Sequence, residues 1–176
     1  MRSFVLIALI AGLASMALAA DKVENPVYKT WATQKVGTVV KFHITTNDKT
    51  NSQTDMVWTL MEVTPEKVVV DTVYMPKNFN QSRPIPAMID PATTQRSGPA
   101  SKPGTTLTIT QGDEVVKAAG RSFPCHWTAT TEKSASETRV ITSWNCPDVP
   151  GGEVKFDITD GTTQVMTRVL TYFKVP

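Results

Sequence analysis

The chain has 176 residues, a formal net charge of +2 and two cysteines. Lysine and arginine nearly balance aspartate and glutamate, and no basic run exists of the kind that binds nucleic acid. The length fits one ordinary domain, with a core large enough to fold without a metal ion.

The N-terminus has the three parts of a secretory signal peptide. Arg2 supplies the positive charge, Phe4–Leu13 is an apolar run, and Ala17–Ala19 fits an A-x-A cleavage site. The run is too short for a membrane span, which needs about 20 apolar residues. We therefore predict a signal peptide over 1–19 and a mature single β domain over 20–176, exported to the periplasm or secreted. A retained N-terminal anchor is the alternative.

The first half of the mature chain is rich in threonine and valine, which favour strands. One short segment, Pro26–Lys35, is the best candidate for a helix. Apolar and polar residues then alternate as in half-buried strands. This pattern predicts strands over Thr38–Thr46, Gln53–Val63 and Val68–Met75.

A proline-rich segment, Pro76–Gly104, follows. It holds six prolines, which remove donors from a strand ladder, so we predict a long irregular loop with a short edge strand near Ala87–Ile89. Beyond it the sequence predicts a strand over Thr105–Thr110, a turn at Gln111–Glu114 and a strand over Val115–Ala118.

The next segment reads as a hairpin whose register can be argued. Strands over Phe123–Glu132 and Glu137–Asn145 face each other if the turn is centred between Ala135 and Ser136. That register gives an opposite-charge pair, an aromatic pair and a cysteine pair, each favourable across two strands. The pairs are Glu132 with Arg139, Trp127 with Trp144, and Cys125 with Cys146.

Asp160-Gly161 is a strong signal for a second hairpin with a two-residue turn. A turn centred there pairs Phe156 with Val165, and Glu153 with Arg168. Together the segments predict an all-β protein, an antiparallel meander of about eight strands that forms a closed or half-open barrel-like sheet. A two-sheet sandwich is the alternative.

Cys125 and Cys146 are predicted to form a disulfide, because an exported chain with an even cysteine count favours one and the hairpin register places them opposite each other. The bridge would close a loop of about 20 residues and contribute about 3 kcal/mol. Two buried free thiols are the alternative. A reactive Cys125 is disfavoured, because the neighbouring His126 points to the opposite face of its strand.

No other constellation predicts catalysis, so we expect no enzyme activity, no catalytic residue, no metal and no cofactor. His43 and His126 are the only histidines, and no local spacing supplies a third metal ligand. Phosphate-binding and nucleophile-elbow motifs are missing from the sequence.

The strand over Gln53–Val63 is apolar on both faces. Met56, Trp58 and Leu60 share one face, and they are the candidate ligand-binding residues. A barrel-like sheet could hold an apolar ligand against this face, with the proline-rich segment as a lid. The alternative is a strand packed on both sides within the core.

Several motifs resemble those of a group of uncharacterised small exported bacterial β proteins. Trp31 with Val36–Val40 is similar to their opening W…VG(S/T)xV, and Val63–Val70 to their second hairpin. Gly120–Cys125 resembles their GKxFxC step, and Trp144 with Val149–Lys155 their W…VPGGxVK step. The resemblance implies an exported β fold and brings no catalytic residue with it. In strand order and export the chain also has a distant likeness to periplasmic lipoprotein-carrier half-barrels, whose helices it lacks.

The function these patterns favour is non-enzymatic binding of an apolar or amphipathic ligand, such as a lipid, in a β-barrel-like cavity. A structural or protein-interaction module of the cell envelope is the alternative. Nucleic acid is excluded as a partner by the charge balance, and a stable membrane span of the mature chain by its hydropathy.

Overall fold

Nine strands of the described residues form one antiparallel sheet, and most of them were predicted from the threonine- and valine-rich segments. The computed structural model describes residues 21–47, 51–76, 79–90 and 105–176; the expected signal peptide lies outside them. The strands of this sheet are β2 (Val39–Thr46), β3 (Gln53–Val63), β4 (Lys67–Met75), β5 (Phe79–Pro86), β7 (Thr106–Ala118), β8 (Arg121–Lys133), β9 (Thr138–Asn145), β10 (Glu153–Asp160) and β11 (Thr163–Lys174).

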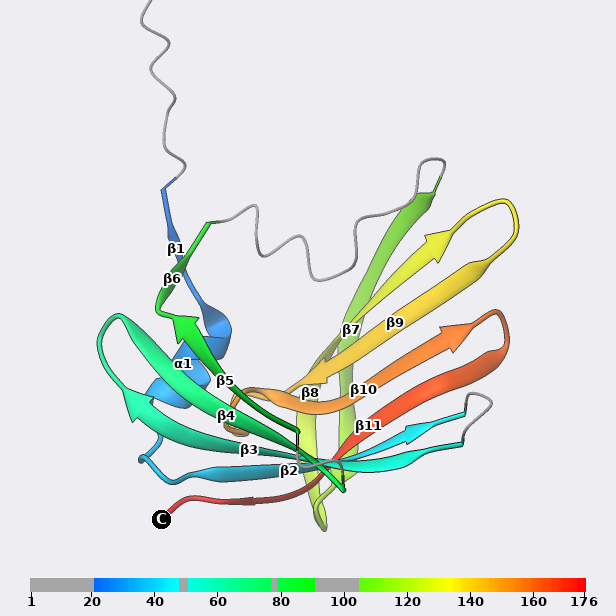
Figure 1. The fold of residues 1–176 in the computed structure, drawn as a ribbon. Helices are drawn as coiled ribbons and strands as arrows, with labels where there is room; N and C mark the ends of the chain where they lie inside the picture. Colours follow the sequence, from blue (N-terminus) through cyan, green and yellow to red (C-terminus); the bar gives the residue numbers. More distant parts are fainter. Residues whose placement is uncertain (1–20, 48–50, 77–78, 91–104) are drawn as a thin grey trace, which may run out of the picture.

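The sheet consists of two meanders that join in its middle. Its order is β5-β4-β3-β2-β11-β10-β9-β8-β7, so β11 returns to pair with β2. The edge strands β5 and β7 do not pair with each other, and the sheet is therefore open rather than closed. The prediction of an all-β antiparallel fold is confirmed in its half-open form. Figure 1 shows two wings, β3–β5 on one side and β7–β11 on the other, that diverge from the region where β2 and β11 lie.

The single helix of the described residues, α1 (Pro26–Ala32), packs on β3, β4 and β5. It begins where Asn25 caps it, accepting a hydrogen bond from the backbone of Val27 at 3.0 Å, with Pro26 in the first turn. The side-chain amide of Asn25 also donates to the carbonyl of Pro86 at 2.9 Å. A two-residue pairing of β1 (Val23–Glu24) with β6 (Met88–Ile89) continues this attachment, so the helix is tied to the β5 edge.

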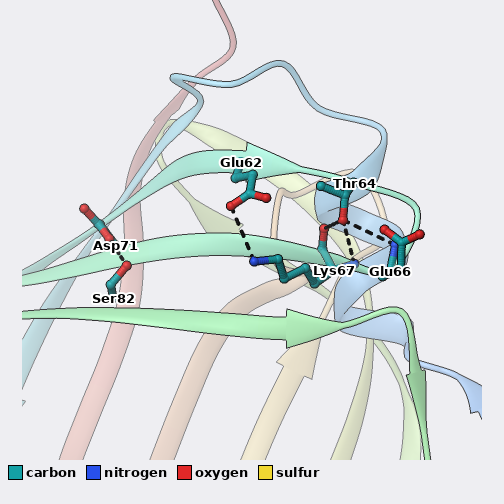
Figure 2. A network of polar contacts seen from close by, with 6 residues as sticks. All are labelled: Glu62, Thr64, Glu66, Lys67, Asp71 and Ser82. Carbon is teal, nitrogen blue, oxygen red and sulfur yellow. Dashed lines mark hydrogen bonds and ion pairs between the residues drawn. The ribbon is translucent and has the colours of Figure 1, made fainter.

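The turn between β3 and β4 holds the other side of the helix. Thr64 closes this turn through its hydroxyl, which donates to the carbonyl of Lys67 and accepts from its backbone N–H, both at 3.1 Å. Tyr28 of the helix donates to the carbonyl of Thr64 at 2.8 Å. Figure 2 shows the turn and, further along, Ser82 of β5 donating to Asp71 of β4 at 2.5 Å.

β5 corrects the prediction of an irregular loop over Pro76–Gly104. Residues 79–86 form an edge strand paired with β4, and residues 91–104 lie outside the described part of the chain. Prolines are tolerated here because an edge strand pairs on one side only, so a proline can point its missing donor outward. Pro84 and Pro86 both lie in this strand, opposite Val69 and Lys67.

β7 corrects the prediction of a turn at Gln111–Glu114, since one continuous strand runs through these residues. Gly112 lies opposite Trp127, and a Cβ atom at Gly112 would come within 2.9 Å of the indole ring. The glycine thus marks a close packing contact rather than a turn.

Of the two predicted hairpin registers, the first is confirmed and the second is wrong. In the first, Glu132 lies opposite Arg139 and Trp127 opposite Trp144, as predicted. In the second, Phe156 lies opposite Arg168 and not opposite Val165. The second register was wrong because Asp160 pairs with Thr163, which moves the turn along the chain, and a bulge between Ile158 and Thr159 adds one further residue of shift.

The core fills the space beneath α1 and around the segment that joins β9 to β10. Trp31 is the buried residue of the helix and lies 6.3 Å from the ring of Trp58. Val149, Pro150, Gly151 and Gly152 of the joining segment are all buried. The largest apolar side chains of the core include Trp31, Phe42, Met56, Leu60 and Leu170.

Candidate functional site

A cavity of about 350 Å³ lies between α1 and the wing of β3–β5. Its remaining lining comes from the end of β9, the segment that joins β9 to β10, the start of β10, and β11. Two rows of the ladder form its floor: Met56 lies opposite Tyr74 in one, and Thr72 lies opposite both Trp58 and Gln81 in the other. The residues that line it come from separate segments of the chain: Val27, Trp31, Met56, Trp58, Val70, Thr72, Tyr74, Gln81, Arg83, Ile85, Asn145, Gly151, Glu153 and Arg168.

Its apolar wall is built mainly from aromatic rings and aliphatic side chains. Trp58 meets Phe42 edge-on, with ring centroids 4.7 Å apart, and the tilted ring of Trp31 lies 6.3 Å from that of Trp58. Gly151 approaches both rings so closely that a Cβ atom there would come within 2.9 Å of Trp31 Nε1 and 3.0 Å of Trp58 Cζ3. The rings therefore have little room to move, and they form a fixed wall.

Two of the three candidate residues from the sequence lie in this wall. Met56 and Trp58 line the cavity, whereas Leu60 is fully buried at 0% exposure and does not. Leu60 belongs to the next part of β3, where its backbone N–H donates to Thr38 and its carbonyl accepts from Gly37. The segment that contains Gly37 and Thr38 covers this part of β3 and encloses Leu60 in the core. Ligand binding by Met56 and Trp58 remains a prediction.

The polar side of the cavity contains an ion pair that the sequence predicted for a different reason. Arg168 donates from Nε and Nη2 to the two carboxylate oxygens of Glu153, at 2.5 and 2.6 Å. Both side chains are largely buried, with 19% and 14% exposed. The guanidinium also lies 4.7 Å from the ring centroid of Phe156. These contacts compensate the charge of Arg168 and fix its position.

No pattern in the sequence points to Arg83, because the prolines of its segment predict an irregular loop. It lies on β5 opposite Val70 and is exposed. Among the residues that the structure describes, no carboxylate lies within ion-pair distance of its guanidinium. Gln81, two residues earlier on the same face, is exposed as well. The part of the lining on β5 is thus exposed and carries an uncompensated positive charge.

Cys125 and Cys146 are held as free, buried thiols, in contrast to the predicted disulfide. β9 ends at Asn145, so Cys146 is the first residue beyond the ladder, and its backbone N–H donates to Gly152 instead of continuing the hairpin. Burial and, second, the nearby Cys146 raise the pKa of Cys125 from 9.0 to about 11. Neither thiol faces the cavity.

Each histidine has an aspartate partner on the adjacent strand, which no pattern in the sequence predicts. His43 Nδ1 lies 2.8 Å from Asp55, and His126 Nδ1 lies 3.0 Å from Asp113. Both pairs are exposed cross-strand contacts outside the cavity. Within the described part of the chain, no three His, Cys, Asp or Glu side chains are grouped so as to hold a metal ion.

A larger hollow of about 520 Å³ lies at the turn between β7 and β8. It is lined only by consecutive residues, from Lys117 to Ser122, so no groups from separate elements converge on it. The cavity beside α1 is therefore the better candidate site. Over residues 21–47, 51–76, 79–90 and 105–176, no helix is both long and apolar enough to cross a bilayer.

Neither a protein-family model nor a curated protein matches this chain. Solved structures do share its fold. A candidate exported protein with a YmcC-like fold from Bacteroides fragilis is similar with a TM-score of 0.51 at 11% identity, over 80% of this chain and 97% of that chain. A candidate lipoprotein from Parabacteroides distasonis has a TM-score of 0.50 at 15% identity, over 80% and 96% of the two chains. At these identities the likeness is one of fold alone, and the motif-level resemblance stays a prediction.

Proposed function

We propose that this is an exported, non-enzymatic binding protein that holds an apolar or amphipathic ligand in the cavity beside α1. The observation that carries the proposal is the composition of that cavity. Aromatic and aliphatic side chains form one wall, and polar and charged side chains make up much of the rest, which suits a ligand that has an apolar and a polar part. Its volume of about 350 Å³ is at the lower end for such sites.

Size limits the ligand to a small molecule or to one end of a longer lipid. At about 30 Å³ for each heavy atom, the share of one water in the liquid, the cavity would hold roughly a dozen such atoms. That corresponds to a single chain of about ten carbons with a polar end. Met56 at the floor can adapt to chains of different shape, because its side chain is unbranched.

The experiment is native mass spectrometry, with organic extraction, of the protein purified from its own export compartment. A small molecule of defined mass should accompany the protein. The cavity is tested by Thr72→Trp, which places a large ring among the lining residues and should remove the bound molecule. Val73→Trp is the matched control, since the neighbouring side chain on β4 points to the opposite face. Equal retention by both variants would exclude this cavity as the site.

Export is the second part of the proposal. The N-terminal pattern supports it, as do the fold neighbours, which are named as a candidate exported protein and a candidate lipoprotein. Cell fractionation should find the protein outside the cytoplasm, and N-terminal sequencing should read from Ala20. Recovery in the cytoplasm with an intact N-terminus would contradict export.

In the exported protein we further propose that Cys125 and Cys146 become bridged. Their neighbours His126 and Asn145 lie directly opposite each other in the ladder of β8 and β9, which supports a short distance between the two sulfur atoms. An oxidising compartment would then favour the bond. Intact-mass measurement of exported protein should show a loss of two hydrogen atoms relative to protein reduced before analysis. An unchanged mass would leave the thiols free.

A module that binds another protein is the second candidate function, and the free edge of β7 favours it. Leu107, Ile109 and Val115 lie on one face of this strand and are 51%, 65% and 66% exposed. An edge strand with exposed apolar side chains can accept an added strand from a partner. Crosslinking in cells should then give a defined adduct that Ile109→Lys abolishes, and persistence of the adduct in that variant would argue against the edge.

A further inference from the structure

We infer that the ligand of this cavity carries an anionic group, and that Arg83 selects it. The inference rests on the proposed binding function and adds the chemical class of the ligand. An oxyanion at one end of an apolar chain is the chemistry that the lining residues fit. Carboxylates and phosphates share this chemistry, and arginine binds both through paired N–H donors.

The charges around the cavity support an anion. Three charged side chains line it, two arginines and one glutamate. Glu153 is committed to Arg168 through two hydrogen bonds, so this pair contributes no net charge. Arg83 has no ionic partner among the described residues and is left as the one uncompensated charge of the lining. A cationic ligand would meet this charge unfavourably, and a neutral one would leave it unused.

The position of Arg83 fits an amphiphile rather than a free anion. Arg83 lies on the exposed edge strand, while Met56 and Trp31 at the inner side are 1% exposed. Gln81, on the same face of β5, offers an amide donor next to the guanidinium. A ligand would therefore place its apolar chain inward, against Trp58 and Val70, and its anionic end outward at β5.

The probes are four compounds that separate charge from chain. Decanoate has both, decanol has the chain alone, decyltrimethylammonium has the opposite charge, and acetate has the charge alone. Binding to the purified mature chain is followed by tryptophan fluorescence, because Trp31 and Trp58 line the cavity, and by calorimetry. We expect decanoate to bind about tenfold more tightly than decanol, since a hydrogen bond to a charged group is stronger than one to a neutral group. Decyltrimethylammonium should bind more weakly than decanol, and acetate should give no signal.

Arg83→Gln should remove the preference for decanoate and leave the affinity for decanol unchanged, which also shows that the variant is folded. Lys133→Gln removes an exposed charge outside the cavity and should keep the preference. Equal binding of decanoate and decanol by the native chain would overturn the role of Arg83 while the binding function stands. The same holds if Arg83→Gln keeps the tenfold ratio. If neither decanoate nor decanol binds, the binding function fails together with the inference.

Discussion

Gly151→Ala should be the most destabilising small change near the cavity, because two separate costs meet at this residue. Its φ of +83° lies in the left-handed region, where a side chain costs about 1–2 kcal/mol. An added Cβ would also come within 2.9 Å of Trp31 Nε1 and 3.0 Å of Trp58. Trp31 is 1% exposed and packs closely around this residue, so overpacking should add about 1–3 kcal/mol. We expect a total loss of about 2–5 kcal/mol in the free energy of unfolding.

Two other glycines separate these costs. Gly161 has a φ of +59° with open space around it, so Gly161→Ala reports the backbone cost alone. Gly112 lies in a regular strand with its Cβ position 2.9 Å from Trp127, so Gly112→Ala reports packing alone. Trp127 is only half-buried and can turn away, and we expect a cost of about 1 kcal/mol there.

The assay is urea denaturation of the native chain and the three variants, followed by tryptophan fluorescence. The free energies of unfolding are compared between curves that have the same m-value. Distant sites add to within about 0.5 kcal/mol, which sets the resolution of the comparison. If Gly151→Ala costs no more than Gly161→Ala within that margin, the two rings do not form a rigid wall, and the packing argument for the cavity is wrong.

Three further changes test the surroundings of the site. Burial raises the pKa of Cys125 to about 11 in the folded state, so in reduced protein the free energy of unfolding should fall as pH rises from 9 towards 11. Urea curves at pH 8 and 10 test this, and Cys125→Ala should make the fall with pH smaller. Glu153→Gln should cost about 2 kcal/mol in the same assay, because it leaves the largely buried Arg168 unpaired, and should raise the preference for decanoate over decanol. Asn25→Ala should cost about 1–2 kcal/mol through the lost helix cap and its bond to β5, and an unchanged urea midpoint would refute that role.

Local patterns predicted most of the strands and one hairpin register. The strand over Gln53–Val63 was predicted with its observed ends, since it is long and bounded by turn residues. The register of β8 and β9 followed from pairs that attract each other across the strands, Glu132 with Arg139 and Trp127 with Trp144. Such pairs indicate the register of two strands that follow each other directly in the sequence.

Patterns failed where a residue type has two physical uses. A run of prolines predicts irregular chain, but Pro84 and Pro86 lie in an edge strand that needs no donor on its outer side. The residues around Gly112 predict a turn, but this glycine makes room for an indole ring on the adjacent strand. Only the pairing of distant segments decides between these uses, and the sequence of one segment does not contain it.

The candidate site was predictable only in its wall. Met56 and Trp58 stood out because their strand is apolar on both faces. Arg83 and Gly151 reach the same cavity through the pairing of β5 and the buried segment after β9. Their place in the cavity depends on contacts between residues far apart in the chain, so no local spacing predicts it.

A bulge in β10 also sets the charge of the cavity. Glu153 and Lys155 lie opposite the adjacent residues Asn145 and Trp144 of β9, so the register shifts by one residue between them. Such a shift turns the side chains on one side of it to the other face of the strand. Phe156 lies opposite Arg168, and the bulge brings Glu153 to this same face, where its carboxylate binds the guanidinium of Arg168. The charge of Arg168 is therefore compensated and Arg83 is left as the one uncompensated charge of the lining, so the proposed anionic ligand depends on the local geometry of β10.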